Sequence, residues 1–272
     1  MVRVNCHVHS TESDGELEPR EIVEMAVDEG LTHICFTDHF RMPKDVNDYR
    51  DERKHLDSYY EELNLLRREF FGKVKVLIGV ELDWLEGYEK WFVEELGDRN
   101  YDFVLGSVHW LRDATGRMNR PHFPKGGLEV FGGERAFIEL YLKEIRKMIE
   151  FGLIDCVAHL DVFRERLEGN EVLDNDWYRE EVLDLLKLME SKGIALEFNC
   201  AGWGILGEQF PQRWIIEKAV DMGIGVTVGN DFHKLKHGSL DMGIDQAFEM
   251  LREIGCSEVL VFRGRKSEGL RI

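Results

Sequence analysis

Histidine and carboxylate residues recur along this sequence at spacings suited to binding metal ions. His7 and His9 are separated by one residue, and Asp231 and His233 repeat this spacing far along the chain. Side chains two residues apart in an extended segment point to the same side. Imidazole and carboxylate ligands without a thiolate cluster favour zinc, manganese or iron over a cysteine-bound structural zinc or an all-oxygen calcium site.

Further histidines and carboxylates, and one asparagine, follow segments with strand-like patterns. They are His39, Glu81, His109, His159, Glu197 and Asn199. Asp38 and His39 are adjacent and would face opposite ways, so we expect only one direct ligand there, with the other orienting a ligand from behind. The set exceeds one tetrahedral shell, which indicates two or three divalent ions (Zn, Mn or Fe) that share a bridging carboxylate.

The segments that must position these residues alternate between β-rich runs and longer amphipathic stretches. Strands are predicted at 2–7, 33–37, 74–81, 103–109, 156–159, 194–199, 225–231 and 258–262. Helices are predicted at 19–29, 56–71, 88–95, 134–151, 176–192, 213–222 and 240–254. Repeated strand–helix units predict a parallel sheet.

Seven or eight such units without a linker predict one closed α/β barrel domain spanning residues 1–272. A doubly wound open sheet is the alternative, weakened by the absence of a glycine-rich nucleotide-binding loop. In α/β barrels the carboxyl ends of the strands build the active site, which is where the histidines and carboxylates fall. The irregular segment 111–133 is expected to be a long loop over that end.

Composition narrows the possible partners. The chain has 272 residues and a formal charge of −18, from 35 basic and 53 acidic residues. This balance speaks against nucleic acid and anionic membranes as partners, although a local metal cluster can still attract a small anion. No apolar run is long enough for a membrane span, and no secretion signal precedes the first predicted strand. We therefore expect a cytoplasmic protein; its oligomeric state is left open.

The motifs together resemble the polymerase-and-histidinol-phosphatase (PHP) superfamily over about residues 4–250. The matching motifs are His7-Val8-His9, Ser13-Asp14-Gly15, Thr37-Asp38-His39, Gly79-Val80-Glu81, Gly106-Ser107-Val108-His109, Ala158-His159-Leu160-Asp161 and Asn230-Asp231-Phe232-His233. Within it, the chain is most similar to the monofunctional histidinol-phosphate phosphatases. The resemblance implies a distorted (β/α)7 TIM-like barrel with up to three metals.

The resemblance also implies how the ligands are shared between the ions. The first ion would use His7, His9, Glu81 and Asp231; the second would use Glu81, His109 and His159; the third would use Asp14, His39 and His233. Glu81 would then bridge two ions. A metal-bound hydroxide held near Glu81, Asp231 and His233 would attack phosphorus in line.

Substrate contacts are expected from loops that follow the strands. Arg164 and Arg166 are expected to bind phosphate, since guanidinium groups bind phosphate in a bidentate manner. The other candidates are Asp161, Glu165 or Glu197 for a substrate amine, with Asn199 and His122 nearby. The chain departs from the PHP pattern at Asn230, at Phe232 and at Trp203-Gly204, where a Leu-Arg pair is common.

These features predict a metal-dependent phosphate monoester hydrolase with a small phosphorylated substrate, foremost L-histidinol phosphate in histidine biosynthesis. A PHP phosphoesterase acting on another small ester or nucleotide is the alternative. A metal-dependent amidohydrolase is less favoured because no lysine ends a predicted strand. A non-catalytic metal-binding module is the third alternative.

Overall fold

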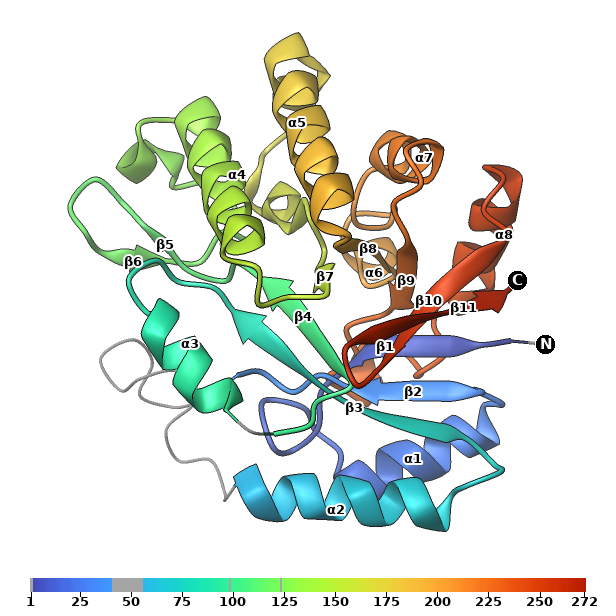
Figure 1. Ribbon diagram of the computed structural model, residues 1–272. Helices are drawn as coiled ribbons and strands as arrows, with labels where there is room; N and C mark the ends of the chain where they lie inside the picture. The colour runs from blue at the N-terminus through green and yellow to red at the C-terminus, as the bar shows by residue number, and fades with distance from the viewer. Residues whose placement is uncertain (1, 41–55, 98, 123) are drawn as a thin grey trace.

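The computed structural model describes residues 2–40, 56–97, 99–122 and 124–272 (Figure 1). Seven parallel strands form one sheet in the order β1-β2-β3-β4-β7-β8-β9. Their bounds are Val4–Val8 (β1), His33–Phe36 (β2), Lys75–Asp83 (β3), Phe103–Ser107 (β4), Cys156–Val157 (β7), Ala195–Asn199 (β8) and Val226–Gly229 (β9). The sheet follows the chain order, as a (β/α) barrel requires.

Helices follow the strands and cover the outside of the sheet. The longer ones are Pro19–Asp28 (α1), Leu56–Glu69 (α2), Glu89–Leu96 (α3), Glu134–Phe151 (α4), Asp176–Lys192 (α5), Arg213–Asp221 (α7) and Ile244–Glu253 (α8); Gly202–Ile205 (α6) is one short turn. In α1 the residues Ile22, Val23 and Ala26 are buried, which is the spacing of a helix face packed on a sheet. Pro19 opens this helix, where its missing N–H costs least.

The first and last strands of the sheet approach each other at the carboxyl end. Val8 forms a parallel bridge with Phe232, and the His9 N–H donates to the Phe232 carbonyl over 2.9 Å. The barrel is therefore nearly closed at the end where the histidines emerge. The predicted (β/α)7 barrel is confirmed.

The opposite end of the barrel is covered by an antiparallel hairpin. It consists of Glu258–Arg263 (β10) and Lys266–Arg271 (β11). Val259 and Val261 are buried in the same apolar cluster as Val4 and Val226. The predicted strand at 258–262 is thus real, but it belongs to this hairpin and not to the barrel. A local alternating pattern cannot tell a barrel strand from a strand that closes its base.

The segment 111–133 is less irregular than predicted. It contains Leu111–Arg112 (β5) paired with Met118–Asn119 (β6), and a 3-10 turn at Leu128–Phe131. Asp113 holds the β5–β6 turn together, since its Oδ1 accepts the Thr115 and Arg117 N–H groups at 2.9 and 3.0 Å. The two strands are two residues long, too short to leave a periodicity in the sequence.

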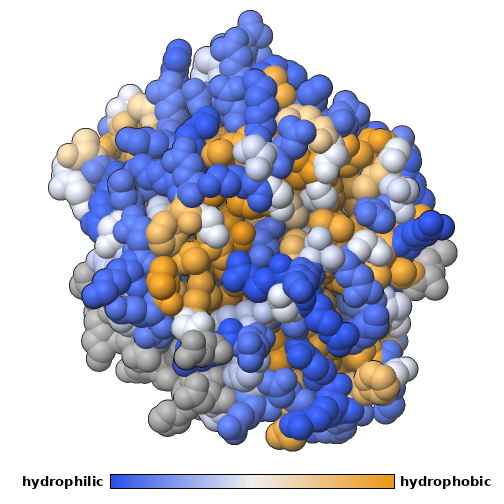
Figure 2. Space-filling model, viewed as in Figure 1, coloured by the Kyte–Doolittle hydropathy of each residue, from blue (hydrophilic) through white to orange (hydrophobic). Residues whose placement is uncertain are grey.

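Polar side chains cover much of the face seen in Figure 2, with apolar side chains showing between them. This agrees with the high content of charged residues, 32% of the chain. Over the part of the chain that is described, no helix combines the length and the apolar character needed to cross a membrane. The five cysteines are all unpaired.

Candidate metal centre

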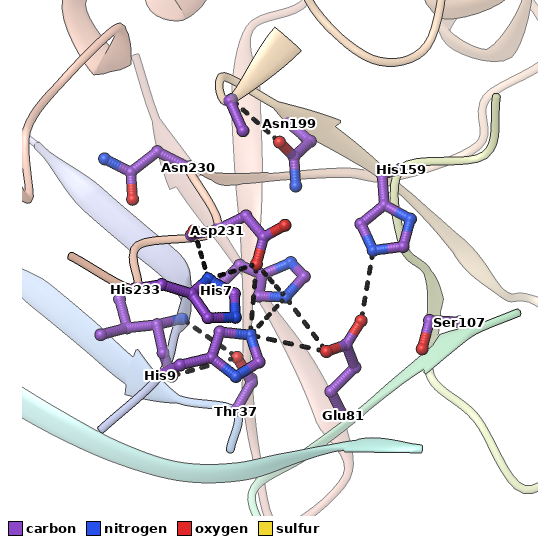
Figure 3. A network of polar contacts seen from close by, with 12 residues as sticks. His7, His9, Thr37, Glu81, Ser107, His159, Asn199, Asn230, Asp231 and His233 are labelled. Carbon is purple, nitrogen blue, oxygen red and sulfur yellow. Dashed lines mark hydrogen bonds and ion pairs between the residues drawn. The ribbon is translucent and has the colours of Figure 1, made fainter. Parts of the chain in front are cut away.

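The carboxyl ends of the barrel strands and the turns that follow them bring nine side chains together. They are His7, His9, Asp14, His39, Glu81, His109, His159, Asp231 and His233. Figure 3 shows Asp231 between three of the histidines, with Glu81 facing the same space from β3. These nine are the residues that the sequence predicted as ligands, and Asp83, which it did not predict, lies among them.

The first group lies at distances that suit one tetrahedral ion. His7 Nε2 is 3.1 Å from His9 Nε2 and 3.6 Å from Glu81 Oε2. Asp231 Oδ1 is 3.2 Å from the Nε2 atom of both His7 and His9, and His9 Nε2 is 3.5 Å from Glu81 Oε2. An ion about 2.1 Å from four tetrahedral ligands would hold those ligands about 3.4 Å apart. The geometry therefore matches a four-ligand shell.

The two oxygens of Glu81 face different sets of histidines (Figure 3). Oε2 faces His7 and His9 at 3.6 and 3.5 Å. Oε1 lies 3.2 Å from His159 Nε2 and 3.7 Å from His109 Nε2. A carboxylate can place one oxygen on each of two ions, which an imidazole in this orientation cannot do. Glu81 is thus located where a bridging ligand would be.

A third group forms around Asp14 at the edge of the site. Its Oδ1 atom lies 3.2 Å from His233 Nε2 and 3.5 Å from His39 Nε2. The other ring nitrogen of His39 faces the centre, 2.9 Å from Glu81 Oε2. His39 therefore lies between the outer group and the Glu81 groups, and either could use it.

Buried carboxylates behind the ligands fix how two of the rings face the centre. His7 Nδ1 lies 2.7 Å from Glu197 Oε1, and His109 Nδ1 lies 2.6 Å from Asp83 Oδ1. Both carboxylates have almost no exposed surface. Donation of Nδ1–H to a carboxylate leaves Nε2 as the lone-pair nitrogen, which is the tautomer a metal ligand needs.

The turn that carries Asp14 is held from β2. Asp38 Oδ1 accepts the Ser10 N–H at 2.8 Å and the Ser13 hydroxyl at 2.5 Å, and the Tyr59 hydroxyl donates to Oδ2. Asp38 is buried away from the centre while its neighbour His39 faces it. The two adjacent side chains point in different directions, as predicted, but the Asp38 carboxylate supports the turn after β1 and, among the described residues, does not contact His39 or another candidate ligand.

Two of the candidate ligands have backbones in the left-handed region. The φ angles are 23° at His159 and 53° at Asp231, and neither residue is glycine. Such conformations cost about 1–3 kcal/mol each and persist where the surroundings enforce them. At His159 the N–H donates to Glu197 Oε2 over 2.8 Å, so the same carboxylate that orients His7 also holds this turn.

Electrostatics keep the carboxylates charged and one key imidazole neutral. Burial raises the pKa of Glu81, but His39, His109 and His7 outweigh it and hold that pKa well below its ordinary value. Asp231 behaves in the same way, with His7 and His233 lowering its pKa. Burial, His233 and His39 lower the pKa of His9 to about 4. His9 therefore offers a neutral nitrogen at pH 7.

Two buried oxygens test whether metal ions fit this site. Asp14 Oδ1 and Glu81 Oε2 are buried and have no hydrogen-bond donor among the described residues; only the ring nitrogens of the candidate histidine ligands face them. A buried anionic oxygen without a hydrogen bond is costly unless it is paired or coordinates a metal. With four-ligand spacing and oriented imidazoles around them, the residues fit divalent ions.

A cavity of about 610 Å³ opens beside the cluster. Its wall includes the ligands Asp14, His39, His109, Asp231 and His233. Arg120 and His122 line it from the segment 111–133, Lys234 and Lys236 line it after β9, and Glu165 lines it after β7. His122 therefore reaches the cleft, as expected, with its ring centre 5.5 Å from that of His109.

Arg164 does not reach the cavity, contrary to its expected role in phosphate binding. It is 1% exposed, and its Nη1 donates at 3.2 Å to both Asp161 and the Gln209 carbonyl. Asp161 is also buried and accepts the Gln212 N–H at 2.9 Å. These two residues pair with each other inside the protein, so neither is available to the substrate.

Arg166 and Glu197 are likewise used internally. Arg166 donates from Nε to the Gly126 carbonyl at 3.0 Å and from Nη1 to the Arg120 carbonyl, which holds these two residues in place. Glu197 accepts hydrogen bonds behind His7 and His159, and Asn199 donates to it over 3.1 Å. Arg166, Glu197 and Asn199 therefore support the site from within the protein and do not form the expected contacts with the substrate.

Asp83 and Arg120 had no place in the sequence prediction. Asp83 lies two residues after Glu81 on a strand that runs longer than predicted, to Asp83 itself. Glu81 and Asp83 therefore point to the same face, a spacing that could have revealed Asp83. Arg120 stacks on Trp110, with its guanidinium carbon 4.9 Å from the ring centre. Only the fold of the segment 111–133 brings it to the cavity.

The arrangement agrees with the comparison to protein families. The PHP domain matches residues 5–201, which include most of the nine candidate ligands. The chain belongs to the PHP domain family. The remaining two candidate ligands, Asp231 and His233, lie beyond the matched region, just after β9.

PHP relatives resemble the chain along almost its entire length. A probable histidinol-phosphatase of Deinococcus radiodurans is 30% identical over 254 residues, covering 92% of each chain. The histidinol-phosphatase of Lactococcus lactis is 28% identical over 280 residues, covering 98% of this chain and 96% of its own. The crystal structure of histidinol phosphate phosphatase from Lactococcus lactis, complexed with zinc, L-histidinol and phosphate, superimposes with a TM-score of 0.75 at 24% identity, covering 98% of both chains.

The carboxylate behind His7 gives a testable consequence for this PHP centre. We expect Glu197→Gln to weaken metal binding about 10- to 100-fold, because a neutral amide cannot replace the carboxylate that orients His7. Competition with a fluorescent metal chelator would measure the affinity. Glu180→Gln, on the exposed side of α5, is the matched control. If Glu197→Gln leaves the metal affinity unchanged, Glu197 does not position His7 for metal binding.

Proposed function

We propose that this protein hydrolyses L-histidinol phosphate to L-histidinol and phosphate at a centre of two or three divalent metal ions. The observation that carries the proposal is Glu81, whose two oxygens face two sets of histidines beside an open cavity. The relatives named as histidinol-phosphatases support the choice of ester, since they match 92% and 98% of the chain.

The metal ions would be held as the spacing of the ligands suggests. His7, His9 and Asp231 would share one ion with Glu81, and His109 and His159 would lie on the other side of Glu81. Asp14 and His233 would hold a further ion with His39. When bound, such ions lower the pKa of coordinated water and neutralise phosphate oxygens.

The protein itself supplies orientation and charge around the phosphorus. Asp83 and Glu197 fix the His109 and His7 rings, so the lone pairs face the centre before substrate arrives. Arg120, Lys234 and Lys236 line the cavity and place positive charge near an incoming phosphate. This local charge lets a protein with a net charge of −18 bind an anion.

A phosphate-release assay on a panel of esters tests the proposed function. The panel contains L-histidinol phosphate, several sugar phosphates and nucleotides, and one diester. We expect kcat/KM for L-histidinol phosphate to exceed the others by about two orders of magnitude or more, which is near 3 kcal/mol of discrimination. Equal rates across the panel, or preference for a nucleotide or diester, would contradict the proposal.

A further inference from the structure

Glu165 is held in place by the two arginines on either side of it in the sequence. All three lie on the 3-10 turn Val162–Arg166 that follows β7. Arg164 bonds inward to Asp161 and the Gln209 carbonyl. Arg166 donates to the carbonyls of Arg120, Gly126 and Gly127. The anchors on both sides fix the turn between them.

The turn presents the Glu165 side chain to the cavity. Both arginines are buried, at 1% and 5% exposure, whereas Glu165 is half-buried and lines the cavity wall beside the metal ligands. No described residue gives the Glu165 carboxylate a hydrogen bond or an ion pair. Arg164 and Arg166 therefore form hydrogen bonds within the protein, whereas the Glu165 carboxylate faces the cavity.

Such a carboxylate is costly to keep charged in the absence of a partner. Burial is the largest influence on Glu165 and, with Asp231, raises its pKa to about 7, although His159 acts in the opposite direction. A cation bound against it would remove this cost. A cationic ligand would therefore bind more favourably to this half-buried carboxylate than to a solvated carboxylate at the surface.

The other two carboxylates expected to meet a substrate amine are excluded by their contacts. Asp161 is fully buried against Arg164 and the Gln212 N–H. Glu197 is 1% exposed and lies behind His7 and His159. Neither lines the cavity. Of the three candidates, only Glu165 can touch a molecule bound there.

We propose that Glu165 binds the primary ammonium group of the substrate and so selects amine-bearing phosphate esters. The inference rests on the proposed function, because it assigns one group of the ester to one wall of the same cavity. The phosphate would lie at the metal ligands and the ammonium at the turn after β7. Because the substrate would be held at both its phosphate and its ammonium group, the amine would be necessary for tight binding.

The test compares L-histidinol phosphate with the same ester lacking the amine, 3-(imidazol-4-yl)propyl phosphate. We expect Glu165→Gln to raise KM for the amine ester about 10- to 100-fold, and to change KM for the deaminated ester by less than about threefold. Glu165→Asp should recover part of the loss. Glu168→Gln, exposed and three residues further on, is the matched control and should leave both values unchanged. Equal changes for the two esters would overturn the proposal.

A binding measurement separates this inference from the proposed function. Calorimetry with L-histidinol and 3-(imidazol-4-yl)propanol uses no turnover. We expect the metal-loaded protein to bind the amine alcohol at least about tenfold more tightly, and Glu165→Gln to abolish the difference. If no ester is hydrolysed but this difference is present, the proposed function fails and the amine site stands. If esters are hydrolysed but the difference is absent, the amine site fails alone.

Discussion

Replacing Glu81 with glutamine should lower kcat for L-histidinol phosphate about a thousandfold and release at least one metal ion per chain. Its oxygens face His7 and His9 on one side and His159 on the other, so the neutral amide would weaken both shells at once. Loss of about 4 kcal/mol of charge stabilisation in the transition state corresponds to this factor. Steady-state kinetics and elemental analysis of the purified variant measure the two effects.

The control for this variant is Glu86→Gln. Glu86 follows the same strand, but its side chain is 61% exposed and pairs with Lys147 at the surface. It should keep its metal content and its kcat. Circular dichroism of both variants shows whether the barrel is intact. A folded Glu81→Gln protein with full metal content and normal kcat would exclude the bridging role.

Removal of the metal ions should lower Tm by about 10 °C. Ions bound at a thousand times their dissociation constant stabilise the fold by about 4 kcal/mol, and each kcal/mol shifts Tm by about 2–4 °C in a protein of this size. Thermal melts with and without excess chelator, followed by readdition of zinc or manganese, measure the change. If the chelator leaves Tm unchanged, the cluster binds no metal ion that stabilises the fold.

The same melts should depend on pH in a defined direction. Burial lowers the pKa values of His7, His159 and His233, but nearby carboxylates raise them above the ordinary 6.5. In the metal-free protein their protonated forms stabilise the fold fully below pH 6.5, and this contribution is lost as pH rises through the raised pKa values. Metal binding requires the unprotonated rings. The Tm gained from metal should therefore be larger at pH 8 than at pH 6.

The barrel, and the convergence of most candidate ligands at one end of it, could be predicted from the sequence because both follow from position on strands; Asp14 was predicted only through the resemblance to the PHP superfamily. His7 and His9 at the end of one strand, and Asp231 and His233 at the end of another, converge in any barrel whose strands run parallel. The helix boundaries followed from local features such as Pro19 and the apolar face of α1. These are rules that act over a few residues.

The substrate contacts were not accessible in the same way. Arg164 and Arg166 have the right chemistry close to His159, but a five-residue turn directs them into the protein and leaves Glu165 at the cavity. Whether a loop residue faces inward depends on carbonyls such as those of Gly126 and Gln209, 40 and 45 residues away. No local pattern encodes those contacts. The departure at Asn230 is similar: its side-chain amide bonds the Leu240 carbonyl at 3.0 Å and supports the cavity wall.

A metal titration of the metal-free protein, followed by phosphate release from L-histidinol phosphate, tests the central claim most directly. With two sets of ligands sharing Glu81, we expect no turnover without metal and little with one equivalent of zinc or manganese per chain. The rate should rise as the second equivalent binds and level off by the third. Full activity in the metal-free protein, or no release of phosphate at any metal loading, would contradict a multinuclear phosphatase centre at these strand ends.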